Sequence, residues 1–173
     1  ERTTCRLCGS AQLSPLFSLG TQYVNDFPED PRKPGVQAPL EMVFCEQCTL
    51  VQLKHTAPQE LLYRGFYWYK SGVTETMRRA LRDITASAER FHLQPGDVVL
   101  DIGSNDGTLL RTYQVPGLVT VGVEPAKNLA EEGRQGITHF INDFWTVQNY
   151  QKTISKKAKI ITATNVFAHV KEL

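Results

Sequence analysis

The chain has 173 residues, 41% of them hydrophobic, and its 19 Lys+Arg nearly balance 18 Asp+Glu for a formal charge of +1. This length allows one domain or two small ones with a buried core, and the weak charge argues against a nucleic-acid or membrane-surface partner. No apolar run approaches the roughly 18 residues of a membrane span, and no signal peptide follows Glu1. We expect a soluble, cytoplasmic protein whose partner is a small molecule.

All four cysteines fall in two Cys-x-x-Cys pairs. A tight turn across each pair points both sulfurs to one side, so two facing turns supply the four thiolates of a tetrahedral zinc site. Disulfides suit secreted chains, and a redox pair needs a single Cys-x-x-Cys at the start of a helix, so zinc is the better interpretation. The sequence predicts a closed structural site, which shifts the net charge to about −1, with the ligands Cys5, Cys8, Cys45 and Cys48.

Strand-forming residues flank the second cysteine pair, at 40–44 and 50–53. Between the pairs, four prolines and several charged residues crowd 28–39, which predicts an exposed loop that joins two short hairpins. We expect residues 1–57 to form a small β-rich zinc-binding domain whose core is too small to fold without its metal.

An aromatic segment follows, with five aromatic residues in the seven positions 63–69. We expect Phe66 and Trp68 to pack as a hydrophobic seam between the zinc domain and its neighbour. Tyr67 and Tyr69 carry hydroxyl groups that need partners, so they are candidates to line a polar site. Apolar residues at three- and four-residue spacing then predict an amphipathic helix over 73–91, which makes 58–94 a linking region.

From Asp97 onward, short β-branched runs alternate with helical stretches, which predicts a parallel sheet covered by helices. A doubly wound sheet normally has at least five strands, so we expect 95–173 to be the N-terminal half of a Rossmann-like domain and the chain to be a fragment. The fold class is therefore α/β, a β-rich zinc domain followed by a truncated parallel sheet. The expected strands are 98–102, 119–123, 137–141 and 160–164, with helices near 107–113, 126–133 and 146–154.

The candidate binding residues follow the ends of these strands. The first strand ends in Asp101, and the turn that contains Gly103 and Gly107 leads into a helix, so backbone N–H groups gather at the carboxyl edge of the sheet. The dinucleotide fingerprint fails because Asn105 and Thr108 replace its second and third glycines. The turn therefore suits a ligand with a cationic part better than a pyrophosphate.

Two further strand ends carry polar residues. A carboxylate at Glu124, after the second strand, can accept both hydroxyls of a ribose, and Asp143-Phe144, after the third, can offer a hydrogen bond and an apolar face to a base. Each acid alone is also explained as a helix cap or a solvated loop residue, and for Asp106 capping is the expected role. Because the three strand ends lie side by side at one edge of the sheet, their polar residues together predict a nucleoside pocket.

At these residues the sequence resembles the S-adenosylmethionine-dependent sugar C-methyltransferases that carry an N-terminal zinc-binding domain and methylate nucleotide-linked ketosugars. The resemblance covers the whole chain. It rests on Cys5-x-x-Cys8-Gly9, Leu19-Gly20, Asn25-x-Phe27, Cys45-x-x-Cys48 with 50–53, Tyr67-x-Tyr69-x-Ser71-Gly72, 101–110, Gly122-Val123-Glu124-Pro125 and 165–170.

This resemblance implies S-adenosylmethionine as a cofactor beside zinc, and methylation of a carbon through an enolate. It assigns the glycine turn to the methionine end of the cofactor, and it makes His169 and one tyrosine, Tyr69 in preference to Tyr67, face the substrate as catalytic residues. From its position alone, His169 is equally well explained as a helix-start histidine satisfied by the backbone. The implied cofactor-binding residues are Asp101, Gly103, Asn105, Gly107, Glu124, Pro125, Asp143, Phe144 and Asn165.

Family members continue with a Glu-His pair that resembles the catalytic base, so we expect this fragment to bind cofactor weakly and not to turn over. Two alternatives remain open. One is a zinc-containing RNA methyltransferase, for which the basic cluster at 152–159 is the only candidate contact. The other is a non-catalytic zinc- and nucleotide-binding interaction module. The sequence does not determine the sugar, the methylated carbon or the oligomeric state.

Overall fold

The computed structural model describes residues 1–24, 30, 32 and 35–170. The chain divides into two compact units: a small unit of residues 1–62 with Val170, and a large unit of residues 63–169. A short π-helix, η1 (Glu60–Arg64), spans this division in the sequence. The expected Asn25-x-Phe27 motif and most of the proline-rich loop lie outside the described residues.

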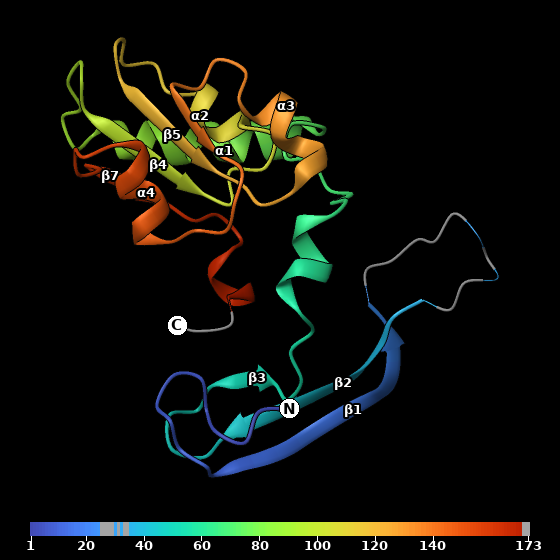
Figure 1. Cartoon of the computed structure of the whole chain (residues 1–173). Helices are drawn as coiled ribbons and strands as arrows, with labels where there is room; N and C mark the ends of the chain where they lie inside the picture. Colours follow the sequence, from blue (N-terminus) through green and yellow to red (C-terminus); the bar gives the residue numbers. More distant parts are fainter. Residues whose placement is uncertain (25–29, 31, 33–34, 171–173) are drawn as a thin grey trace. The chain divides into compact units, whose positions relative to one another are not determined.

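The small unit contains one three-stranded antiparallel sheet (Figure 1). Its strands are β1 (Leu13–Tyr23), β2 (Gln37–Cys45) and β3 (Val51–Leu53), in the order β1-β2-β3. The strands expected on either side of the second cysteine pair are confirmed. The two short hairpins are wrong, because β1 pairs with β2 along most of its length, from Leu13 opposite Cys45 to Tyr23 opposite Gln37.

The apolar core of the small unit is slight. Its buried hydrophobic residues, among those described, are Cys5, Val24, Val43 and Cys45. Gln52 on β3 is also buried, and its side chain accepts a hydrogen bond from the Arg6 backbone N–H at 2.9 Å. An amide from the sheet therefore holds the first cysteine turn, where a larger protein would use apolar packing.

The large unit is built on a parallel sheet of β4 (Val98–Ile102), β5 (Val119–Val123), β6 (His139–Ile141) and β7 (Ile160–Thr162). The strand order is β6-β5-β4-β7, with all three pairings parallel, so the chain reverses its direction of winding at β4. In open α/β sheets, ligands bind beyond the carboxyl ends of the strands at such a reversal point. The predicted α/β class is confirmed.

Helices cover both faces of this sheet (Figure 1). On one face, Leu81 and the start of α2 pack on Val99, and on the other, Tyr150 packs on Val98 and Leu100. Alternate β4 side chains thus enter opposite layers, as expected for a strand buried on both sides. The helices are α1 (Glu75–Glu89), α2 (Thr108–Arg111), α3 (Ala130–Gly133) and α4 (Val147–Thr153), with 3-10 turns η2 (Lys127–Leu129) and η3 (Phe167–His169).

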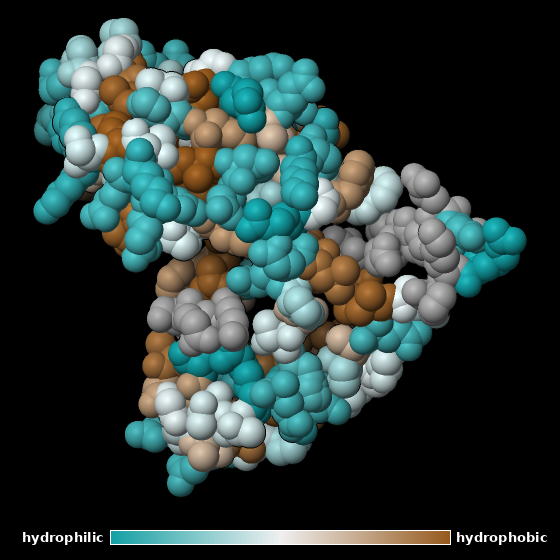
Figure 2. All heavy atoms as spheres, viewed as in Figure 1, coloured by the Kyte–Doolittle hydropathy of each residue, from teal (hydrophilic) through white to brown (hydrophobic). Residues whose placement is uncertain are grey.

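Phe66 and Trp68 lie near the start of the large unit, and their expected role as a seam between the two units stays a prediction. The rings of Phe66 and Trp68 pack on each other with their centroids 4.5 Å apart, and each residue is 57% exposed. Elsewhere on the large unit, Figure 2 shows mainly hydrophilic residues with hydrophobic ones in scattered patches on the visible face. Within the described part of the chain, no helix is both long and apolar enough to span a membrane.

Candidate functional site

The four cysteine sulfurs form one cluster in the small unit, with all four atoms within 4.8 Å of one another. The Sγ atoms of Cys5 and Cys48 are 3.5 Å apart and those of Cys8 and Cys45 are 3.6 Å apart. Zinc–sulfur bonds of about 2.3 Å in a tetrahedron place sulfurs about 3.8 Å apart, whereas a disulfide needs about 2.0 Å. The donor set and its spacing therefore fit a zinc site better than a pair of disulfides.

Asp101 is buried inside the large unit, with 3% of its surface exposed. The Thr162 hydroxyl on β7 donates to its Oδ1 at 2.6 Å. Burial raises the pKa of Asp101 to about 7, with a further contribution from the charge of Glu124, while the Thr162 hydrogen bond opposes the shift. The end of β4 thus carries a carboxyl group that titrates near neutrality.

The turn after β4 requires its glycines. Gly103 and Gly107 have φ of +69° and +78°, and Asn105 between them has φ of +53°. A Cβ on Gly103 would clash with Val166 Cγ2, and one on Gly107 would lie 2.6 Å from the Gly133 carbonyl oxygen. The turn is therefore closely packed as well as left-handed, so no other residue fits either position without a shift.

The side chains of this turn hold the aromatic segment. Asn105 Oδ1 accepts from the Ser71 N–H at 2.9 Å, and its Nδ2 donates to the Tyr69 carbonyl at 3.0 Å. Asp106 accepts from the Gly72 N–H at 2.7 Å and from the Thr108 N–H at 3.0 Å, so it binds the first N–H of α2 although the N-cap residue itself is Gly107. The sequence indicated Asn105 only as a cofactor residue and gave no sign of these hydrogen bonds to residues 69 and 71.

Asn128, which was not among the predicted site residues, also binds the aromatic segment. Its side-chain amide accepts from the Tyr67 N–H at 2.9 Å and donates to the Tyr67 carbonyl at 3.1 Å. The only signal in the sequence is its place four residues after Glu124. Together, Asn105, Asp106 and Asn128 fasten residues 67–72 to the large unit.

Glu124 follows β5 and is 6% exposed. Its Oε2 accepts from the Asn105 N–H at 3.0 Å and its Oε1 from the Ala126 N–H at 2.8 Å. Burial raises the pKa of Glu124, and these two hydrogen bonds oppose that shift. Because each carboxylate oxygen can accept about two hydrogen bonds, one acceptor position on each oxygen is still available for a hydroxyl group.

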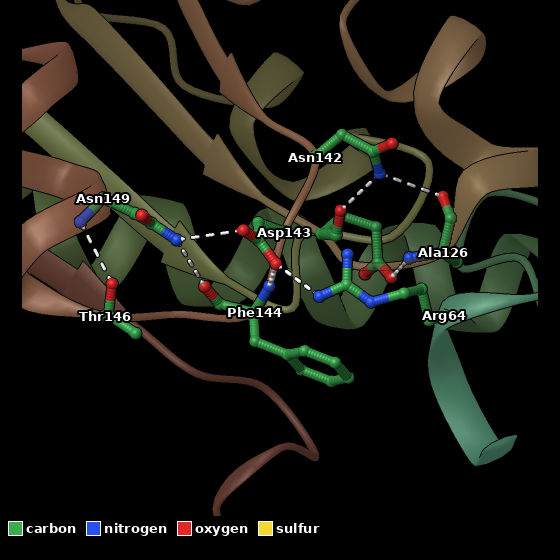
Figure 3. Close-up of polar contacts among 8 residues, drawn as sticks. Arg64, Ala126, Asn142, Asp143, Phe144, Thr146 and Asn149 are labelled. Carbon is green, nitrogen blue, oxygen red and sulfur yellow. Dashed lines mark hydrogen bonds and ion pairs between the residues drawn. The ribbon is translucent and has the colours of Figure 1, made fainter. Parts of the chain in front are cut away.

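Asp143 and Phe144, after β6, are in contact with Arg64 (Figure 3). Arg64 Nη2 lies 2.5 Å from Asp143 Oδ1, and the guanidinium carbon lies 4.9 Å from the centroid of the Phe144 ring. The Arg64 hydrogen bond is the main cause that lowers the pKa of Asp143. The Asn149 amide donates to the other Asp143 oxygen at 3.2 Å. Arg64 was not among the predicted site residues.

The structure distinguishes the two candidate tyrosines. Tyr67 is half-buried, and burial, followed by the charges of Glu124 and Tyr69, raises the pKa of its phenol. Its ring centroid is 5.8 Å from that of Tyr63, which is in turn 6.4 Å from the ring of His169. Tyr69 is 47% exposed. Tyr67 is therefore the more buried of the two tyrosines, and it contacts Tyr63, which the sequence did not reveal as a candidate.

The remaining candidates lie at strand ends. Pro125 is partly buried between Glu124 and Ala126, and Asn165 is exposed with a left-handed φ of +58°. His169 ends η3, is exposed, and donates its backbone N–H to the Val166 carbonyl.

In the basic cluster, Lys156 and Lys159 bind groups of the large unit itself, including the Gly96 carbonyl and the Asp97 carboxylate.

Comparison with known proteins agrees with the sequence resemblance. Residues 5–63, which include all four cysteines, match the family Methyltransf_13, described as "Putative zinc binding domain". The C-methyltransferase NovU of Streptomyces niveus is 26% identical over 174 residues, which cover 98% of this chain and 41% of that protein. The chain therefore spans less than half the length of this curated relative.

Among solved structures, a SAM-dependent methyltransferase from Geobacter sulfurreducens in complex with S-adenosyl-L-homocysteine is similar at 17% identity. The similarity covers 68% of this chain and 47% of that one, with a TM-score of 0.39. A likeness at this level carries no conclusion about the ligands of this chain. The family resemblance rests on the zinc-domain match and on the relative that covers nearly the whole sequence.

Proposed function

We propose that this chain is a member of the S-adenosylmethionine-dependent C-methyltransferases with a zinc-binding N-terminus and that it binds S-adenosylmethionine at the carboxyl edge of its parallel sheet. The observation that carries the proposal is Glu124. Its carboxylate is buried at the end of β5 and fixed by two backbone N–H groups, yet each oxygen retains an acceptor position. That arrangement suits the two vicinal hydroxyls of a ribose.

The other expected cofactor residues lie around the same edge. The Gly103 turn follows β4, where a closely packed backbone leaves its N–H groups as donors for the methionine end. Asp143 and Phe144 follow β6 and offer an acceptor and an aromatic face for adenine. When bound, S-adenosylmethionine supplies an electrophilic methyl group on a sulfonium.

We further propose that the acceptor is a carbon atom beside the ketone of a nucleotide-linked sugar. The name of the relative, a C-methyltransferase, supports carbon as the acceptor. For that carbon to attack, it must first lose a proton to form an enolate with the neighbouring ketone. We assign Tyr67 and His169 to binding the developing oxyanion and moving this proton. Both of their rings lie near the ring of Tyr63, at centroid distances of 5.8 and 6.4 Å. Tyr69 is the less favoured tyrosine because it is more exposed.

Zinc has a structural role in this proposal. Four cysteine ligands complete the tetrahedral shell, so the site leaves no open position for substrate or water. The RNA methyltransferase alternative loses its main support, because Lys156 and Lys159 of the basic cluster are engaged within the large unit.

Isothermal titration of the zinc-loaded chain with S-adenosylhomocysteine tests the cofactor assignment. We expect micromolar binding, weakened at least about tenfold in Glu124→Gln, since the amide loses one acceptor and the charge that both hydroxyls need. Glu131→Gln, an exposed change on α3, is the matched control and should bind like the wild type. Absence of binding by the folded wild-type chain would contradict the proposal.

A further inference from the structure

Arg64 occupies the surface that the cofactor base is expected to use. Its guanidinium covers Phe144 at 4.9 Å from the ring centroid and pairs with Asp143 Oδ1 at 2.5 Å (Figure 3). These are an aromatic face and a carboxylate acceptor, the two features that would bind a purine by stacking and by a hydrogen bond from its amino group.

Both acceptor positions of Asp143 Oδ1 are already in use, and Oδ2 has one donor. Its Oδ1 accepts from Arg64 and from the Phe144 backbone N–H at 2.8 Å, and its Oδ2 accepts from Asn149 at 3.2 Å. A planar base stacked on the guanidinium-covered side of Phe144 would coincide with the Arg64 side chain, because stacked rings approach to less than the present 4.9 Å separation. The base and Arg64 therefore compete for the same two partners.

We propose that Arg64 is an internal occupant of the base subsite, and that cofactor binding requires its guanidinium to leave Asp143 and Phe144. This inference rests on the proposed function, because the subsite is the one assigned there to adenine. Arg64 thereby sets the affinity of the site. It acts as a competing cation within the chain rather than as a ligand of the cofactor.

The partial exposure of Arg64 allows this exchange. Its side chain is 31% exposed, so the guanidinium can turn toward solvent. Residues 67–72 stay fastened by Asn128, Asn105 and Asp106, and the intervening Gly65 is exposed with open space around its Cα. Release of Arg64 therefore leaves the tyrosine segment in place, so the site can admit a base without losing its candidate catalytic groups.

Titration of variants with S-adenosylhomocysteine tests the inference. Arg64→Leu and Arg64→Ala each remove the cation, and we expect both to bind roughly 5- to 30-fold more tightly than the wild type, which is the effect of losing a partly exposed ion pair and a cation–π contact. Arg134→Leu is the matched control, because Arg134 lies 5.9 Å from the ring of Phe140, away from the candidate residues. It should leave the affinity unchanged.

The outcomes separate the inference from the function on which it rests. Wild-type binding with unchanged or weaker affinity in both Arg64 variants would overturn the inference alone, since Arg64 would then be neutral or part of the binding surface. If neither the wild type nor any variant binds S-adenosylhomocysteine, although circular dichroism shows that all are folded, the proposed function and the inference are both overturned. Binding seen only after removal of Arg64 would support both.

An added guanidinium compound distinguishes competition for the subsite from a purely structural role of Arg64, because only competition would change the apparent affinity for S-adenosylhomocysteine. Methylguanidinium at low millimolar concentration should compete with S-adenosylhomocysteine in Arg64→Ala and lower its apparent affinity toward the wild-type value. It should have a smaller effect on the wild type, whose own guanidinium already fills the subsite. Equal effects on the two proteins would contradict the proposed competition.

Discussion

In the small unit the buried hydrophobic residues that the structure describes include two of the four clustered cysteines, Cys5 and Cys45, and only two valines. The large unit instead buries two apolar layers, one on each face of its parallel sheet. Since apolar burial is the main source of folding free energy, the small unit lacks most of what the large unit has. The comparison indicates that metal binding stabilises one unit and apolar packing the other.

The two units can be followed separately in one chain. Both tryptophans, Trp68 and Trp145, belong to the large unit. Tryptophan fluorescence therefore reports unfolding of the large unit, while bound zinc and protease sensitivity of residues 1–62 report the small one.

The largest effect is expected from Cys45→Ser, because Cys45 is fully buried at the centre of the sulfur cluster. Binding of a structural zinc contributes about 10–16 kcal/mol, more than the stability of a typical small domain. We expect bound zinc, measured by atomic absorption after dialysis against a chelator, to fall from about one ion per chain to near zero. Trypsin should then cleave within residues 1–62, while the urea midpoint by tryptophan fluorescence stays unchanged.

Ser18→Ala, on β1 and away from the cluster, is the control and should keep its zinc. A Cys45→Ser protein that retains zinc, or whose large unit unfolds at lower urea, would contradict the division of stabilising roles between the two units.

A smaller effect is expected from Asp101→Asn in the large unit. The pKa of Asp101 is raised from 3.8 to about 7 in the folded chain, so its ionised form is disfavoured there relative to the unfolded chain. The folded state then holds a proton that the unfolded state has lost, so stability falls as pH rises from about 4 to about 7 and stays low above that. Asparagine should remove this dependence and stabilise the large unit by about 2–4 kcal/mol at pH 8, with little change near pH 4.

Urea unfolding followed by tryptophan fluorescence across this pH range measures the difference. The control is Asp83→Asn, an exposed change on α1, which should follow the wild-type curve. If Asp101→Asn and the wild type lose stability in parallel between pH 4 and 7, Asp101 does not titrate as expected.

The smallest effects come from a matched pair of glycines. Gly9 and Gly103 share a left-handed φ, of +75° and +69°, but a Cβ on Gly9 meets nothing within 4 Å, whereas one on Gly103 meets Val166. We expect Gly103→Ala to lower the unfolding free energy of the large unit by about 2–3 kcal/mol. Gly9→Ala should cost about 1 kcal/mol, seen as roughly fivefold weaker zinc binding against a competing chelator.

A double-mutant cycle divides the Gly103 effect into its parts. In Val166→Ala the γ-methyl groups are gone, so adding Gly103→Ala should cost only the backbone strain, about 1 kcal/mol. An undiminished cost in that background would show that the contact with Val166 is not the cause.

Local patterns accounted for much of the fold. The cysteine spacing predicted the sulfur cluster, and β-branched runs predicted all four strands of the parallel sheet, because these signals lie within a few consecutive residues. Strand β1 was missed because Pro15, Ser18 and Gly20 weaken its local strand signal. Its existence depends on pairing with β2, whose residues lie beyond an intervening loop.

In the candidate site, too, local features were predicted from the sequence and contacts between distant residues were not. The sequence placed Asp101, Glu124 and Asp143 at strand ends, and topology brings those ends to one edge of the sheet. It gave no sign of Arg64 on Asp143, a contact between residues 79 positions apart, nor of the Asn128 hydrogen bonds to Tyr67, 61 positions away. The choice of Tyr67 over Tyr69 likewise came from burial and from the neighbouring Glu124.

By itself, the sequence determined which groups this protein has for chemistry: four thiolates paired for a metal, and a series of acids and glycines at the ends of predicted strands. Only the tertiary structure decided which partners those groups have within the chain, and so which of them hold distant segments together. Asn105 and Arg64 illustrate the reason. A polar side chain satisfies its hydrogen bonds with whatever partner the fold brings near, and that partner is set by packing between segments distant in sequence.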